Sequence, residues 1–302
     1  MNPFRKIFDY FKKHLYIRIL LVGIAFFVMS VLIFQTYLRR EYYQYLRNEA
    51  AETERVILDV SAVNLNSMLR DAVVAGAGVA LDEKLLSQVR EVSSASYPQY
   101  REILDLRTSL NNIVHNKSEI AAAAVVTERG LVCEFGRYWS GGPFGKLWTG
   151  DALPILEDLY EDTLENAGVR SAGNYVIRTE PHTHTGFPSM LLFHIAYPLV
   201  GNGVDKTSSG AVIVLTFQLD KMVKTSGLGD AGMYKNIVEY ITDADGTVLY
   251  YKDSDYLGKK DSDTNLKRED SPVRQLDYFG WEIHTGIDYE SMENQIYWMF
   301  LN

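Results

Sequence analysis

The residues best suited to hold a small ligand lie near the middle of the chain. Arg137-Tyr138-Trp139 follows an apolar segment, residues 131–135, that we predict to be a strand. A guanidinium can hold a carboxylate through two parallel hydrogen bonds, and an indole can enclose the apolar part of the same molecule. We therefore predict Arg137 and Trp139 as ligand contacts. Weaker candidates are Tyr175, Arg178, His194 and Tyr197, because aromatic residues on strands belong to the core more often than to a pocket.

A histidine cluster offers a different chemistry, metal binding. His182 and His184 share one face if their segment is extended, and His194 follows ten residues later. Glu180 is the one acid beside them, and no cysteine is near. We favour a solvated loop and predict no metal site and no cofactor, while the sequence leaves metal binding by His182 and His184 open.

Two further motifs lack the context that their chemistry requires. Residues 227–232 match G-x-G-x-x-G, but a predicted helix precedes them and a strand follows, the reverse of a dinucleotide site. Asp243, Asp245 and Gly246 resemble the start of a calcium loop without its closing glutamate. We interpret the first motif as a hinge and the second as a turn. Because no nucleophile–base arrangement or phosphate loop is found, we expect no enzymatic activity from this chain.

A long apolar run, residues 15–38, predicts a membrane helix. Its 24 residues give about 36 Å of helix, enough to cross a hydrocarbon core of about 30 Å. Five basic residues and one acid lie within residues 1–38, so the positive-inside rule predicts a cytoplasmic segment at 1–14 and an extracytoplasmic segment at 39–294. No small-x-small cleavage pattern follows, which favours an anchor over a signal peptide. Residues 289–302 are interpreted as the truncated start of a second membrane helix.

The composition after residue 38 excludes some partners. This part holds 25 basic and 38 acidic residues, which disfavours nucleic acid and an anionic membrane face. Cys133 is the one cysteine, so no intrachain disulfide can form, and its apolar neighbours favour a buried thiol.

Periodicity divides the rest of the chain into a helical stalk and two α+β units. The stalk, residues 39–118, begins with an unbroken helical pattern, and further helices are expected at 82–92 and 98–115. Spacings of four and three suit pairing with a second copy or packing on the protein's own sheet. The residues that recur at these spacings are Leu46, Ala50, Thr53, Ile57, Val60, Asn64 and Ser67.

Two sheets are expected after the stalk. A membrane-distal subdomain, residues 119–225, holds strands predicted at 120–127, 131–135, 175–179, 190–199 and 210–217, with helices at 153–167 and 218–224. A membrane-proximal subdomain, residues 226–288, holds strands predicted at 237–242, 247–251 and 278–287.

The order of these elements resembles the double Cache family of extracytoplasmic sensor domains. The phrases that carry the resemblance are GAVIVLTFQLD at 210–220, YITDADGTVLY at 240–250, YLGK at 256–259 and GWEI at 280–283. The resemblance covers about residues 40 to 295 and implies two PAS-like antiparallel subdomains in tandem on one long helix. It also implies a transmembrane signal-transduction receptor with a small-molecule ligand, a membrane and a second copy of the chain as partners.

The output of such a receptor is carried by a different domain. In this family it is a histidine kinase, a chemoreceptor or a cyclic-dinucleotide enzyme, and the long helical lead before Ile120 is most similar to the sensor kinases of two-component systems. A membrane-anchored binding module without output, or an exported enzyme, are the alternatives.

The amino-acid-binding branch of the family uses an Arg-x-Trp pair for the carboxylate and a downstream aspartate for the ammonium. Arg137 and Trp139 match the pair, but Val132 replaces an aromatic and Thr216 stands where the acid would be. The resemblance therefore implies a carboxylate-bearing ligand without specifying an amino acid.

Overall fold

We obtained a computed structural model of the chain. It describes residues 15–95, 100–117, 119–137, 147–148, 152–166, 175–184, 187–200, 208–228, 237–266 and 272–288. The chain forms two compact units, Met1–Thr53 with Ile287–Asn302 and Glu54–Gly286, and each is described by itself. The predicted α+β class with two antiparallel sheets is confirmed.

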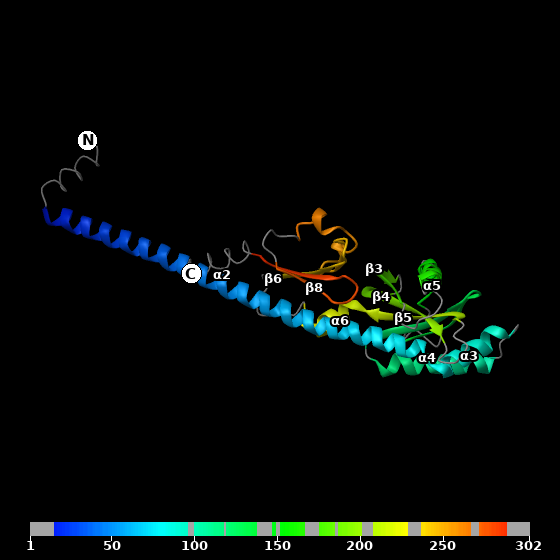
Figure 1. Cartoon of the computed structure of the whole chain (residues 1–302). Helices are drawn as coiled ribbons and strands as arrows, with labels where there is room; N and C mark the ends of the chain where they lie inside the picture. Colours follow the sequence, from blue (N-terminus) through cyan, green and yellow to red (C-terminus); the bar gives the residue numbers. More distant parts are fainter. Residues whose placement is uncertain are drawn as a thin grey trace. The chain divides into compact units, whose positions relative to one another are not determined.

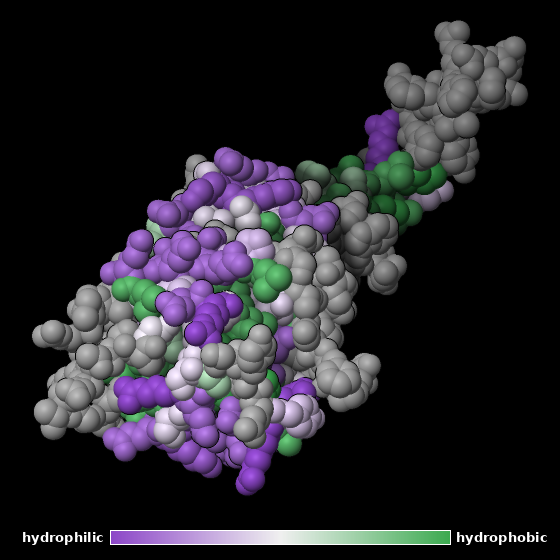
Figure 2. Space-filling model, turned by 90° about the vertical axis from the view of Figure 1, so that its right-hand side faces the viewer, coloured by the Kyte–Doolittle hydropathy of each residue, from purple (hydrophilic) through white to green (hydrophobic). Residues whose placement is uncertain are grey.

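A single helix, α2 (Leu15–Ala80), contains both the apolar run and the first part of the stalk. Among the described residues it is the one helix long and apolar enough to cross a membrane. Its large apolar side chains stand exposed, with Phe26 at 76% and Phe27 at 69%, and they form a green band on the surface in Figure 2. Side chains of this kind need an apolar surrounding, because burial of apolar area is what stabilises them.

The larger sheet lies in the unit Glu54–Gly286 and has five strands in the order β2-β1-β5-β4-β3. All neighbouring pairs are antiparallel. The strands are β1 (Ile120–Thr127), β2 (Gly130–Gly136), β3 (Val176–His184), β4 (Phe187–Val200) and β5 (Ser208–Gln218). Each overlaps a predicted strand, because continuous or alternating apolar runs are strong strand signals.

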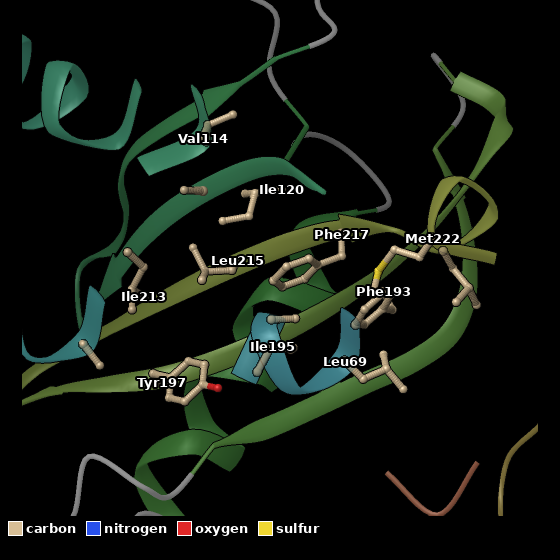
Figure 3. Close-up of a cluster of buried hydrophobic side chains, with 14 of the residues drawn as sticks. Leu69, Val114, Ile120, Phe193, Ile195, Tyr197, Ile213, Leu215, Phe217 and Met222 are labelled. Atoms are coloured by element: carbon tan, nitrogen blue, oxygen red, sulfur yellow. The ribbon is translucent and has the colours of Figure 1, made fainter. Parts of the chain in front are cut away.

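Strand alternation gives this sheet two different faces. The face that we call the stalk face packs on α2 and on the helices α3 (Glu83–Ser94) and α4 (Tyr100–Asn116). Figure 3 shows side chains of β4 and β5 on this face together with Leu69 of α2 and Val114 of α4. The opposite face, which we call the α5 face, packs on Trp148 and on α5 (Leu153–Asn166). In Figure 1, α5 lies on the side of the sheet away from α3 and α4.

The helix α2 meets the stalk face through a different row from the one predicted. Leu58, Leu65 and Leu69 are buried, whereas Val60 is 52% exposed and Asn64 lies at the surface. The two rows differ by about one residue along the helix, and the larger leucines fill the groove on the sheet better than the polar seam does.

The smaller sheet has four strands in the order β7-β6-β9-β8. They are β6 (Ile237–Thr242), β7 (Val248–Tyr250), β8 (Val273–Gln275) and β9 (Glu282–Ile287), and α6 (Leu219–Ser226) leads toward them. The short β8 was not predicted. The last strand begins at Glu282 instead of 278, because residues 276–281 form a turn in which Leu276 N donates to the oxygen of Trp281 over 2.8 Å. The predicted helix from residue 289 lies outside the described residues.

Candidate ligand-binding site

A buried polar pair lies on the α5 face of the larger sheet. His194 of β4 and Thr216 of β5 are opposite each other in the strand register, and Nδ1 of the histidine lies 3.0 Å from the threonine Oγ1. His194 is 1% exposed and Thr216 is 0% exposed. Buried polar groups are costly unless they are paired, so this hydrogen bond holds both side chains in place.

An indole ring covers this pair. The ring centroids of Trp148 and His194 are 4.7 Å apart, and Trp148 is 1% exposed. Two hydrogen bonds fix the main chain of the indole segment, because Oε2 of Glu134 accepts from Leu147 N over 3.2 Å and from Trp148 N over 3.3 Å. The strand β2 therefore positions the segment that closes over His194.

The indole N–H of Trp148 is a donor in need of an acceptor. Its Nε1 is buried and has no hydrogen-bond partner among the described residues. Leaving a buried donor unsatisfied costs about 1–3 kcal/mol. A bound molecule with an acceptor oxygen would remove that cost.

Small residues lie beside the polar pair on the side toward β2. A row of register partners crosses all five strands, through Gly136, Ala122, Thr216, His194 and Arg178 in turn. Ala122 lies beside Thr216 and Gly136 lies beside Ala122, so the row carries small residues toward β2, beneath the layer that holds Trp148 and α5. Arg178 ends this row by its backbone position, and its side chain lies outside the described part of the chain.

Two of the predicted site residues meet on the opposite, stalk face. The rings of Tyr175 and Tyr197 are 5.5 Å apart, and the Tyr197 hydroxyl donates to the oxygen of Val73 over 2.8 Å. Burial raises the pKa of both hydroxyl groups. Both rings pack with the core between sheet and helices, so they do not share a face with His194.

Arg137 follows β2 and uses its guanidinium on α4. Its Nη2 donates to the carbonyl oxygens of Val114 and Lys117, the second over 2.6 Å. These oxygens lie near the end of α4, where a positive charge is favourable. A ligand contact by Arg137 stays a prediction, and Trp139 lies outside the described residues.

The histidine pair predicted as a possible metal site falls within β3. The backbones of His182 and His184 pair with Leu192 and Phe187, but their side chains lie outside the described part. Among the residues that the structure describes, no group of three or more His, Cys, Asp or Glu is placed to hold a metal ion.

Sequence reasoning missed Trp148 and Glu134. Trp148 lies between a glycine-rich segment and α5, where no periodic pattern marks a residue as buried. The available signal was Glu134 itself, a charged residue inside an apolar strand, which often has a specific partner.

Comparisons with known proteins give structural neighbours only. No protein-family model matches the chain, and no curated protein sequence does either. The periplasmic sensory domain of the Campylobacter jejuni chemoreceptor Tlp1 is similar, with 12% identity and a TM-score of 0.56 over 80% of this chain and 98% of that one.

The ligand-binding domain of the Pseudomonas aeruginosa PAO1 amino acid chemoreceptor PctB is a second neighbour. In complex with L-Gln it matches with 16% identity and a TM-score of 0.51, over 82% of this chain and 93% of that one. In complex with L-Arg it matches with 15% identity and a TM-score of 0.50, over 81% of this chain and 97% of that one. Identities this low show the fold alone, and the chain has the tandem PAS-like, double Cache fold of these sensor domains.

Proposed function

We propose that this chain is the extracytoplasmic sensing region of a transmembrane receptor. It binds a small carboxylate-bearing molecule on the α5 face of the larger sheet. The observation that carries the proposal is the buried group formed by His194, Thr216 and Trp148, which has a donor without an acceptor among the described residues. A sensor fold supports the same reading.

The chemistry of this group favours an anionic oxygen as the ligand's anchor. The indole N–H can donate a hydrogen bond to a ligand, and the His194–Thr216 pair, which uses one of its donors for the 3.0 Å contact within the pair, has one further donor when the imidazole is neutral. Oε2 of Glu134 already accepts hydrogen bonds from two main-chain N–H groups, so this carboxylate holds the backbone of residues 147–148 in place. The amino acids bound by PctB also carry a carboxylate. Arg178, at the end of the same row, would supply the positive charge, and Arg137 and Trp139 remain the predicted alternatives.

The proposed topology follows from α2. Its apolar part crosses the membrane with residues 1–14 in the cytoplasm, and the two sheets lie outside the cell. Ligand binding then shifts α2 between two positions, to the extent that the ligand prefers one of them. The parent protein would be a sensor histidine kinase of a two-component system, with a chemoreceptor as the alternative, and the chain itself has no catalytic role.

The proposed assembly is a homodimer through the outer face of α2. Val56, Val60, Val63 and Val74 are 56%, 52%, 68% and 63% exposed. Their spacings of four, three and eleven residues fit the heptad pattern of two parallel helices.

The test is a thermal-shift titration of the full chain in lipid nanodiscs with a panel of small carboxylates. Replacing Thr216 with valine removes the hydroxyl and keeps the shape. The matched control is Thr242→Val in the smaller sheet, where an equally buried threonine bonds His284 Nε2 over 2.9 Å. We expect one carboxylate to stabilise the wild type and Thr242→Val, and to lose at least tenfold in affinity for Thr216→Val. Equal affinity of the two variants would overturn the site.

A further inference from the structure

A cavity on the stalk face is not used by the proposed sensing site. It has a volume of about 180 Å³ and lies between α2 and the start of β1. Phe217 lines it, whereas its neighbour on β5, Thr216, belongs to the α5 face. Successive strand residues point to opposite faces, so the sheet separates this cavity from the His194 site.

The inner wall of the cavity is apolar. Ile120 and Phe217 are each 1% exposed and come from neighbouring strands of the sheet, as Figure 3 shows. Met68 and Ala75 of α2 face them. The short side chain of Ala75 leaves the cavity open, since a longer side chain at position 75 would fill it.

The mouth of the cavity is charged. Asp71 of α2 and Glu119 of the segment before β1 contribute two acids, and Lys117 contributes one base. The Asp71 side chain is 63% exposed and lies 3.8 Å from the Arg70 guanidinium, a surface contact worth little. Among the side chains that line the mouth, two carboxylates stand against one ammonium, while the Arg70 guanidinium lies outside the lining and the Arg137 guanidinium is occupied by the carbonyl oxygens of Val114 and Lys117.

The wall that carries Lys117 and Glu119 is held in place without a ligand. The oxygen of Lys117 accepts from Ile120 N over 3.3 Å and from the Arg137 guanidinium over 2.6 Å. A preformed wall lowers the ordering cost of binding.

We propose that this cavity binds a small aliphatic amine. The alkyl chain would lie against Ile120 and Phe217, with the ammonium between Asp71 and Glu119. The size fits, because an apolar cavity of about 150 Å³ is known to accept benzene, and an amine with five carbons has as many heavy atoms. Such a ligand contacts α2 directly, so it would shift the helix that the proposed receptor uses for signalling to the extent that it prefers one of the two positions. The site does not depend on the proposed carboxylate site.

The test uses the full chain in lipid nanodiscs and three probes of equal length, n-pentylamine, n-pentanol and pentanoate, titrated by calorimetry at pH 7. We expect saturable binding of the amine and at least tenfold weaker binding of the alcohol. Any pentanoate bound at the proposed carboxylate site should be unaffected by Ala75→Leu, because that site lies on the other face of the sheet. Absence of amine binding, or pentanoate binding that Ala75→Leu abolishes, would overturn the proposal.

Variants locate the amine. Ala75→Leu should fill the cavity and abolish binding, while Val74→Leu, at a 63% exposed neighbour, should leave it unchanged. Asp71→Asn with Glu119→Gln, both at the mouth, should weaken binding at least tenfold even if Ala75→Leu fails to fold. Thr216→Val should bind the amine as the wild type does. Loss of amine binding in Thr216→Val would place the amine on the other face and refute this site, whatever the outcome for carboxylates.

Discussion

The ring of Tyr197 lies directly against the backbone of α2 at Gly76. A Cβ at this glycine would lie 2.7 Å from the tyrosine Cζ and 3.0 Å from Cδ2, closer than side chains pack. The Tyr197 hydroxyl donates to the oxygen of Val73 one turn earlier, over 2.8 Å. The larger sheet is therefore attached to the stalk helix at a point where only glycine fits.

Replacing Gly76 with alanine should destabilise the protein. Forcing an extra methyl into this contact must displace the Tyr197 ring, at a cost of about 1–3 kcal/mol. The control is Gly78→Ala, because a Cβ there meets no atom within 4 Å. In an exposed helix, that change should stabilise by about 0.5–1 kcal/mol. Thermal unfolding of the two variants measures both changes in stability. A shift of the unfolding temperature in the same direction for both variants would contradict the packing described.

Phe279 should store backbone strain. Its φ is +67°, the left-handed region that bulky residues avoid, and its ring lies 5.3 Å from that of Trp281 and 6.1 Å from that of Tyr175. Phe279→Ala and Phe279→Gly both remove the ring, but only alanine keeps the strain. We expect the glycine variant to be more stable than the alanine variant by about 1–2 kcal/mol in denaturant unfolding. Equal stability would show that the backbone there is relaxed.

The ion pair between α2 and β8 should contribute little. Arg274 Nε lies 2.7 Å from Asp59 Oδ1, and both side chains are 54% exposed. A double-mutant cycle with alanine at both positions should give a coupling of about 0.2–1 kcal/mol that falls in 0.5 M salt, because solvent screens exposed pairs. A coupling above about 2 kcal/mol would mean that the pair is buried in the working protein.

Cys133 should resist alkylation in the native protein. Burial raises the pKa of its thiol from 9.0 to about 11, and Arg107 opposes the shift in part. The folded state holds the proton more tightly than the unfolded state, so this stabilisation is present below pH 9 and is lost as the pH rises toward 11. Between pH 9 and pH 11 we expect the free energy of unfolding of the wild type to fall by about 1–2 kcal/mol more than that of Cys133→Ala. Rapid reaction with iodoacetamide at pH 8 would contradict the burial.

Elements with strong patterns were predicted well from the sequence. The strand β1 has the predicted limits, because eight consecutive small or β-branched residues form no competing structure. The strand β8 was missed because its three residues are exposed and show no alternation. The helix α2 continues to Ala80 through two glycines, and one of them, Gly76, is required by the Tyr197 ring, a contact that sequence periodicity does not reveal.

The site was harder to predict than the fold. His194 was recognised as a candidate, but its partners come from a different strand and from a segment without periodicity, so only the folded chain brings Thr216 and Trp148 to it. Tyr197 differs from His194 by three positions on one strand, and that odd spacing sends it to the opposite face.

The most direct test of the account follows the indole N–H of Trp148 by ¹H–¹⁵N NMR in the full chain in nanodiscs, with the stabilising carboxylate added. The signal can be assigned by its loss in Trp148→Phe, and Trp281, buried on the stalk side, is the internal reference. We predict a downfield shift of the Trp148 proton at saturation while Trp281 stays unchanged, because a ligand oxygen accepts that hydrogen bond. Saturable binding of the carboxylate with an unmoved Trp148 signal would contradict the site.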